Sequence, residues 1–103
     1  MSTFRLPRNF TTRLRGEDAD AALRHEIAEE QAASLGRLGR KVEAALAALK
    51  AHEGEDRGEV LKAAADAVWG FLVQREVLGL RDRAAIVAHY EIPREVLARL
   101  GAR

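Results

Sequence analysis

The 103-residue chain has no cysteine, which excludes disulfides, zinc ribbons and thiol catalysis together. Neither His52 nor His89 has a serine or cysteine nucleophile in a local motif, and no glycine-rich phosphate loop occurs. The N-terminal sequence MSTFRLPRNF has no apolar signal region, and no run reaches the roughly 18 apolar residues of a membrane span. We therefore expect a cytoplasmic protein with no membrane segment, no cofactor and no enzymatic activity.

Charge is nearly balanced, with 17 basic and 16 acidic residues and a formal net charge of +1. The total alone therefore indicates neither a nucleic-acid partner nor a membrane partner. Leucine, isoleucine, valine and phenylalanine contribute 26 residues, and alanine contributes another 20. Because alanine buries little area, the predicted core is thin, and a short chain with such a core is expected to associate with a partner.

Helical periodicity dominates the chain after a basic N-terminal arm at residues 1–16. The arm carries four arginines and no acid, which suits an acidic partner or phosphate. We favour docking of the arm on the rest of the protein, because a purely electrostatic arm has no use for its four apolar side chains: Phe4, Leu6, Phe10 and Leu14. Residues 17–103 are predicted to form a single helical domain.

The fold class is predicted to be all-α, a small helical bundle with one long N-terminal helix, a central apolar helix and a short C-terminal helix pair. The long helix runs from about residue 17 to 52, and Gly36 and Gly39 mark a kink, a break or a close approach of another helix. A turn at residues 53–58 leads to the central helix, which ends before Gly79. Asp82 is expected to cap the next helix, and Pro93 to open the last.

The long helix is divided by charge. Residues 17–34 carry six acids and one arginine, whereas residues 35–50 carry four bases and one acid. Antiparallel pairing with a second copy would juxtapose opposite charges. We therefore expect a homo-oligomer, most simply a dimer.

The central helix is apolar on two flanks, which is typical of a helix covered on both sides. Its large side chains are the candidate packing or interface anchors: Trp69, Phe71, Val73 and Val77. Beyond them lies a candidate polar network that brackets Gly79, and we expect it to stabilise a helix end: Arg75, Glu76, Arg81 and Asp82. In this interpretation Arg81→Ala lowers stability.

Residues 83–100 have the apolar spacing of a degenerate helix-turn-helix. Its candidate DNA contacts are Arg94 and Arg99. The segment departs from the motif at Val87, where a small residue is usual, and at Glu91, where glycine with a positive φ is usual. We favour packing of this helix pair on the central helix as an αα-corner, and DNA binding is the alternative interpretation.

His25 and Glu29 have a spacing compatible with metal binding, but two ligands make no site, so no metal is expected. The segment from Trp69 to Gly101 contains QRE at 74–76, GLRD at 79–82 and IPREVL at 92–97. On these residues it resembles a family of short bacterial proteins of unknown function. The resemblance implies a small bacterial protein and brings no activity or ligand with it.

The sequence therefore predicts a non-enzymatic, homo-oligomeric protein–protein interaction module with an unidentified protein partner. The alternative is a small DNA-binding regulator that uses the helix-turn-helix at residues 83–100.

Overall fold

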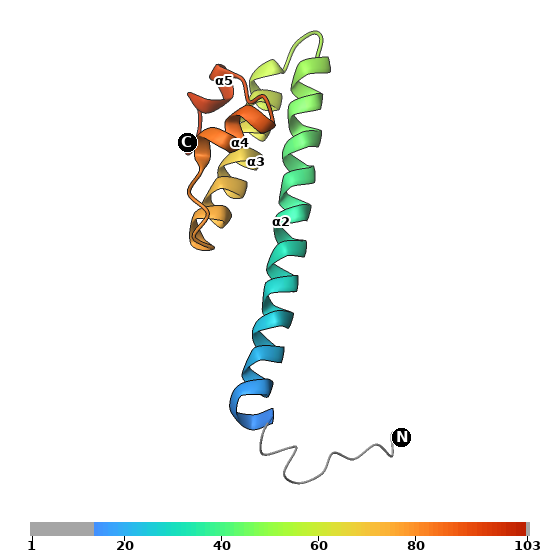
Figure 1. Ribbon diagram of the computed structural model, residues 1–103. Coiled ribbons are helices and arrows are strands. Elements are labelled where there is room, and N and C mark those ends of the chain that lie inside the picture. The colour runs from blue at the N-terminus through green and yellow to red at the C-terminus, as the bar shows by residue number, and fades with distance from the viewer. Residues whose placement is uncertain (1–13, 103) are drawn as a thin grey trace, which may run out of the picture. The chain divides into compact units, whose positions relative to one another are not determined.

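The computed structural model describes residues 14–102, and side chains from Gly16 onward, so the predicted arm lies almost wholly outside the described residues. No strand occurs among the described residues, and the predicted all-α fold class is confirmed. A short π-helix precedes four α-helices (Figure 1): η1 (Leu14–Asp18), α2 (Ala19–Ala51), α3 (Arg57–Val77), α4 (Arg83–His89) and α5 (Arg94–Leu97).

α2 is continuous through both of its internal glycines. The two glycines have different surroundings. A Cβ atom at Gly36 would make only ordinary contact with the guanidinium of Arg40, whereas Gly39 is buried and faces the rings of Phe71 and Tyr90. Of the three explanations left open by the sequence, a close approach of other residues is the one that applies at Gly39.

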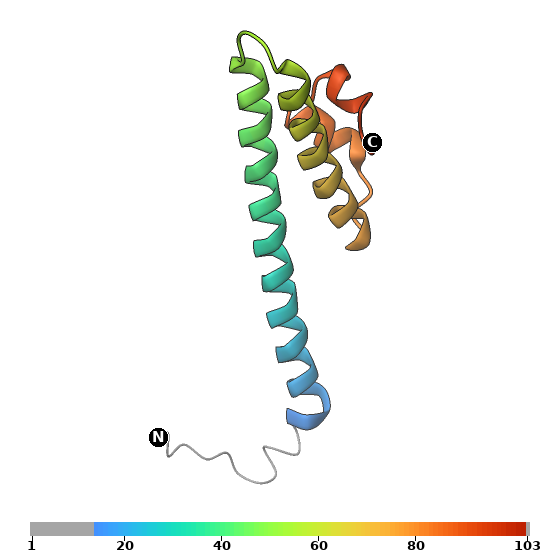
Figure 2. The same ribbon diagram turned by 180° about the vertical axis from the view of Figure 1, so that it is seen from behind.

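The contacts of the chain divide it into two compact units, Met1–Ala33 and Ser34–Arg103. In the described part of the first unit, every residue from Asp20 to Ala33 is exposed. The second unit holds the rest of α2 together with α3, α4 and α5. In that unit α3 lies beside the C-terminal part of α2, and α4 and α5 lie against α3 (Figures 1 and 2).

The core of the second unit consists of small and medium apolar side chains, because alanines and valines occupy many of its positions. The largest side chains that are fully buried are the three valines Val42, Val68 and Val96. α3 supplies most of the core, and α2, α4, α5 and the turn before α5 supply the rest: Val42, Leu49, Leu61, Ala64, Ala65, Ala67, Val68, Phe71, Leu72, Ile86, Ile92 and Val96. This composition agrees with the thin core that the sequence predicts.

Two helix ends in this unit share one type of turn. After α3, the amide of Gly79 donates to the carbonyl of Glu76, and the amide of Leu80 donates to that of Arg75. After α4, the amide of Glu91 donates to Ala88 and the amide of Ile92 donates to Val87. Both patterns are Schellman motifs, which require positive φ at the residue after the cap. Gly79 has φ 84° and Glu91 has φ 50°.

The long helix ends at Ala51, within one residue of its predicted end. Two features of the last predicted helix are corrected by the structure. Pro93 is the cap that precedes α5 and not its first residue. α5 has only four residues, so the last predicted helix is much shorter than expected, and turns fill the interval to Gly101.

Candidate functional site

One face of α3 exposes large apolar side chains at a spacing of four residues. Trp69, Val73 and Val77 are 42%, 40% and 71% exposed, and Leu80 beyond the helix end is 41% exposed. We call these four residues the α3 stripe. Neither α4 nor α5 covers the stripe, so the C-terminal helix pair is not the cover predicted for this flank, and cover by another chain stays a prediction. Single exposed apolar residues are ordinary, whereas here three of them follow one another on one side of a helix.

Phe71, the one predicted anchor that is not in the α3 stripe, belongs to the core. It is 4% exposed, and its ring meets the ring of Tyr90 edge to face at a centroid distance of 5.5 Å. The guanidinium carbon of Arg75 lies 5.7 Å from the centroid of the same ring. Phe71 therefore holds α2, α3 and α4 together from within the second unit and is not available to a partner.

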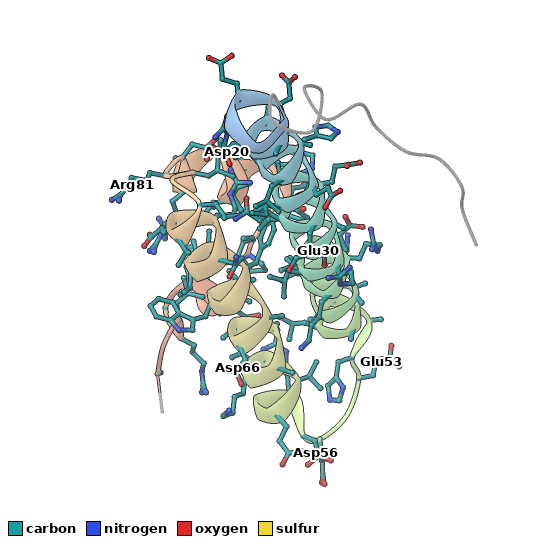
Figure 3. The ribbon with its side chains drawn as sticks, turned by 90° about the horizontal axis from the view of Figure 1, so that it is seen from below. Asp20, Glu30, Glu53, Asp56, Asp66 and Arg81 are labelled. Carbon is teal, nitrogen blue, oxygen red and sulfur yellow. The ribbon has the colours of Figure 1, made fainter. Side chains whose placement is uncertain are left out.

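The polar network at the end of α3 forms with Arg83 in place of Arg81, the second of the two arginines predicted. Arg75 donates to Asp82 at 2.6 Å, and Arg83 donates to Glu76 at 3.4 Å. Among residues 14–102, Arg81 makes no such pair, and it points away from the helices in Figure 3.

Asp82 occupies the predicted cap position of α4, but its carboxylate makes no capping hydrogen bond. The hydrogen bond from Arg75 is the main cause that lowers the pKa of Asp82, and a hydrogen bond from its own backbone amide lowers this pKa further. The arrangement clamps the end of α3 to the start of α4, which is the structural role predicted for the network.

The segment predicted as a helix-turn-helix does contain two helices and a tight turn. Glu91 adopts the positive φ that glycine usually supplies at this turn. Arg94 and Arg99, the candidate DNA contacts, are both exposed. The second helix, however, has only four residues, which gives it little length to lie in a major groove.

Glu95, which follows Arg94, forms an ion pair with a residue far from it in the sequence. Arg57 at the start of α3 donates to both carboxylate oxygens of Glu95, at 2.5 Å and 3.1 Å. These hydrogen bonds are the main cause that lowers the pKa of Glu95 and raises that of Arg57. The sequence gives no signal for this bidentate pair, because its partners are separated by 38 residues.

A solvent-open groove of about 480 Å³ lies next to this pair. Its lining includes Leu46, Lys50, His52, Arg57, Tyr90 and Glu95. Two of its charged groups, Arg57 and Glu95, satisfy each other, and the His52 ring is hydrogen-bonded to the carbonyl of Glu55 at 2.5 Å. The Arg57–Glu95 ion pair is therefore part of the lining of this groove.

His25 and Glu29 are the pair with metal-compatible spacing on α2. The Nε2 atom of His25 lies 3.3 Å from the Oε1 atom of Glu29, and both side chains are largely exposed. Within the described part of the chain, no group of three or more potential ligands gathers around a common point. Nor is any helix there long and apolar enough to cross a membrane.

The chain matches the model of a family of unknown function, DUF6665, over residues 4–103. It belongs to that family. The predicted resemblance to an uncharacterised family is thereby confirmed, but its extent was wrong, because the match covers nearly the whole chain and not the C-terminal third alone. No curated protein and no solved structure matches the chain.

Membership of DUF6665 implies no activity or ligand, so a function for this chain has to be inferred from its surfaces. Two features of this DUF6665 chain were missed by sequence reasoning: the Arg57–Glu95 pair and the pairing of Arg83 with Glu76. The pairing of Arg83 with Glu76 was missed because Arg81 and Arg83 both follow Glu76 closely in the sequence, and their spacing does not show which of them pairs with it.

Proposed function

We propose that this protein is a non-enzymatic interaction module that works as a homo-oligomer, most simply a dimer. The observation that carries the proposal is the exposure of the N-terminal half of α2. Every residue from Asp20 to Ala33 is exposed there, and Leu23 and Ile27 remain 56% and 47% exposed. Because helices in proteins gain most of their stability by packing an apolar side, a partner that covers these residues accounts for this helix.

The α3 stripe supports the same proposal from a second surface. It contains three of the predicted anchors, and it lies on a helix whose opposite side is well buried. Its removal from water would contribute favourably to binding, at roughly 25 cal/mol per Å² of apolar surface. We assign this surface to the protein partner that the sequence predicts, separately from self-association through α2.

The non-enzymatic part of the proposal rests on the residues around the groove at Tyr90, where the charged side chains of Arg57 and Glu95 pair with each other. Bacterial origin and a cytoplasmic location stay predictions from the sequence.

Light scattering of the full chain during size exclusion, across a concentration series, tests the proposal. We expect a dimer for the wild type and a monomer for the double variant Leu23→Glu/Ile27→Glu. Circular dichroism should show that the helices of the second unit are retained in the variant, with any loss of helix confined to the exposed N-terminal half of α2. The matched control Val73→Glu/Val77→Glu alters the α3 stripe and should stay dimeric. A wild type that is monomeric at every concentration would overturn the proposal.

The alternative function is a small DNA-binding regulator, and one observation favours it. The turn at Glu91 has the positive φ of a helix-turn-helix, and Arg94 and Arg99 are exposed beyond it. Against it, the Glu95 carboxylate lies next to Arg94 and would repel phosphate, although Arg57 partly neutralises it.

Binding to mixed-sequence duplex DNA by fluorescence anisotropy, in a salt series, separates the two functions. A regulator should bind with steep salt dependence, and Arg94→Glu/Arg99→Glu should abolish that binding. An interaction module should show no binding even at low salt.

A further inference from the structure

The two halves of α2 present complementary surfaces. On the acidic half, four exposed residues follow one another at intervals of three, four and three: Asp20, Leu23, Ile27 and Glu30. On the basic half, four exposed residues follow at the same intervals: Lys41, Ala44, Ala48 and Ala51. Such intervals place each set of four along one side of its helix.

From this match we infer that two copies of the chain pair through α2 in an antiparallel arrangement. The inference rests on the proposed self-association and names the surfaces that make it. The interval pattern three-four-three is the same in both directions, so spacing alone allows either direction. A parallel match would require one helix to be displaced along its axis by the distance from Asp20 to Lys41, and a two-fold axis does not produce that displacement. In an antiparallel pair the two sets meet residue for residue at both ends of the interface. Leu23 then faces Ala48 of the second copy, Ile27 faces Ala44, and Glu30 faces Lys41.

Side-chain size supports this register. The acidic half offers two large apolar side chains, Leu23 and Ile27, and the basic half offers alanines at the positions that would receive them. A large residue opposite a small one lets two helices pack closely without a void. Neither half matches itself in this way, because leucine would meet isoleucine on one side and alanine would meet alanine on the other.

The distribution of charge along α2 also supports antiparallel pairing with a second copy. The acidic segment at residues 17–34 carries six acids against one arginine, and the segment at residues 35–50 carries four bases against one acid. In a two-fold symmetric pair each contact occurs twice, so the complementary match of acid and base is made at both ends of the interface. A parallel pairing would instead place acid beside acid, which is destabilising.

The absence of cysteine from the chain makes a direct distance test available. Ile27→Cys and Ala44→Cys are made as two separate proteins, mixed, allowed to exchange subunits and oxidised. We expect a disulfide-linked dimer from the mixture and little from either variant alone. As a control, Ile27→Cys is mixed with Ala51→Cys, which displaces the second cysteine by about 10 Å along the helix. That distance exceeds the roughly 7 Å that a disulfide spans between Cα atoms.

The outcomes separate this inference from the proposed function. Preferential linkage of the first mixture supports the antiparallel register. A protein that is dimeric by light scattering but links both mixtures equally, or neither, retains self-association and overturns the register. A protein that is monomeric overturns both.

A charge reversal gives an independent readout. Lys41→Glu places an acid opposite Glu30 of the second copy and should raise the dissociation constant of the dimer by several-fold. Combining it with Glu30→Lys should restore most of the affinity, because the ion pair is then reversed and not lost. If the double variant binds more weakly than Lys41→Glu alone, the proposed facing of these two residues is overturned.

Discussion

The hydroxyl oxygen of Tyr90 lies 2.8 Å from the position that a Cβ atom would take on Gly39. Because the Tyr90 ring also packs edge to face on Phe71 and on His89, the hydroxyl has little freedom to move away. Gly39 is thus the position on α2 against which the side chain of Tyr90, the residue that follows α4, packs.

Gly39→Ala and Gly36→Ala should have opposite effects on stability. Alanine at Gly36 should raise the free energy of unfolding by up to about 1 kcal/mol, since helix propensity improves and its Cβ has room. At Gly39 the same gain is outweighed by overpacking, which costs about 1–3 kcal/mol. Denaturant unfolding of the two variants measures the difference.

Tyr90→Phe provides the control for this pair. Without the hydroxyl, Gly39→Ala should cost less than it does in the wild type, which a double-mutant cycle would detect as coupling. If Gly36→Ala and Gly39→Ala are equally stable in the wild type, the Tyr90 side chain moves aside without cost and the prediction is wrong.

Glu91→Gly should stabilise the protein. Glu91 holds φ 50° in the Schellman turn after α4, and a residue with a Cβ is strained there by about 1–2 kcal/mol. The greater freedom of glycine in the unfolded chain offsets part of this, so we expect a net gain of about 0.5–1 kcal/mol in thermal or denaturant unfolding. Glu53→Gly, at an exposed position without positive φ, should give no gain.

Arg75→Ala should lower the free energy of unfolding by about 1 kcal/mol, through loss of its contact with the Phe71 ring and of its packing. Arg81→Ala should change it by less than about 0.5 kcal/mol, because Arg81 is exposed and points outward. This reverses the expectation from sequence that Arg81 stabilises the network. Thermal melts of the two variants in parallel check it, and a larger loss from Arg81→Ala would contradict it.

Stability should fall on the acid side, and the Arg57–Glu95 pair should account for part of the fall. The hydrogen bonds from Arg57 hold the pKa of Glu95 below its ordinary value of 4.5 in the folded protein. A lowered folded-state pKa means that the unfolded state binds the proton more readily. The contribution of the pair is therefore present above the ordinary pKa and is lost as the pH falls through the lowered one.

Glu95→Gln should make the dependence of melting temperature on pH shallower in this acid range, and Arg57→Gln should flatten it to a similar extent. The double variant should add nothing further, since either change alone removes the pair. Independent effects of the two substitutions would contradict this account.

Local chemistry explains which parts of this fold the sequence could predict. The glycine after α3 and the polar turn before it specify helix ends through backbone conformation, so these ends can be predicted from the sequence. Burial cannot be predicted in the same way, because Phe71 and Trp69 both fit a helical apolar pattern. Only the packing of α2 and α4 decides which of the two lies in the core. Gly36 and Gly39 likewise differ only in what lies opposite them.

The candidate surfaces were predicted where they depend on helical spacing alone, as in the stripe from Trp69 to Val77. The Arg57–Glu95 pair could not be predicted, since it depends on the tertiary position of α5 against the start of α3.

The single tryptophan of the chain lies on the α3 stripe, with its indole ring beside the backbone of Gly101 and nearly half of the residue in water. Its emission spectrum is therefore an intrinsic, label-free reporter of that surface. A protein that covers the stripe would shift the emission towards the blue and shield it from iodide quenching, while pairing through α2 alone would leave both unchanged.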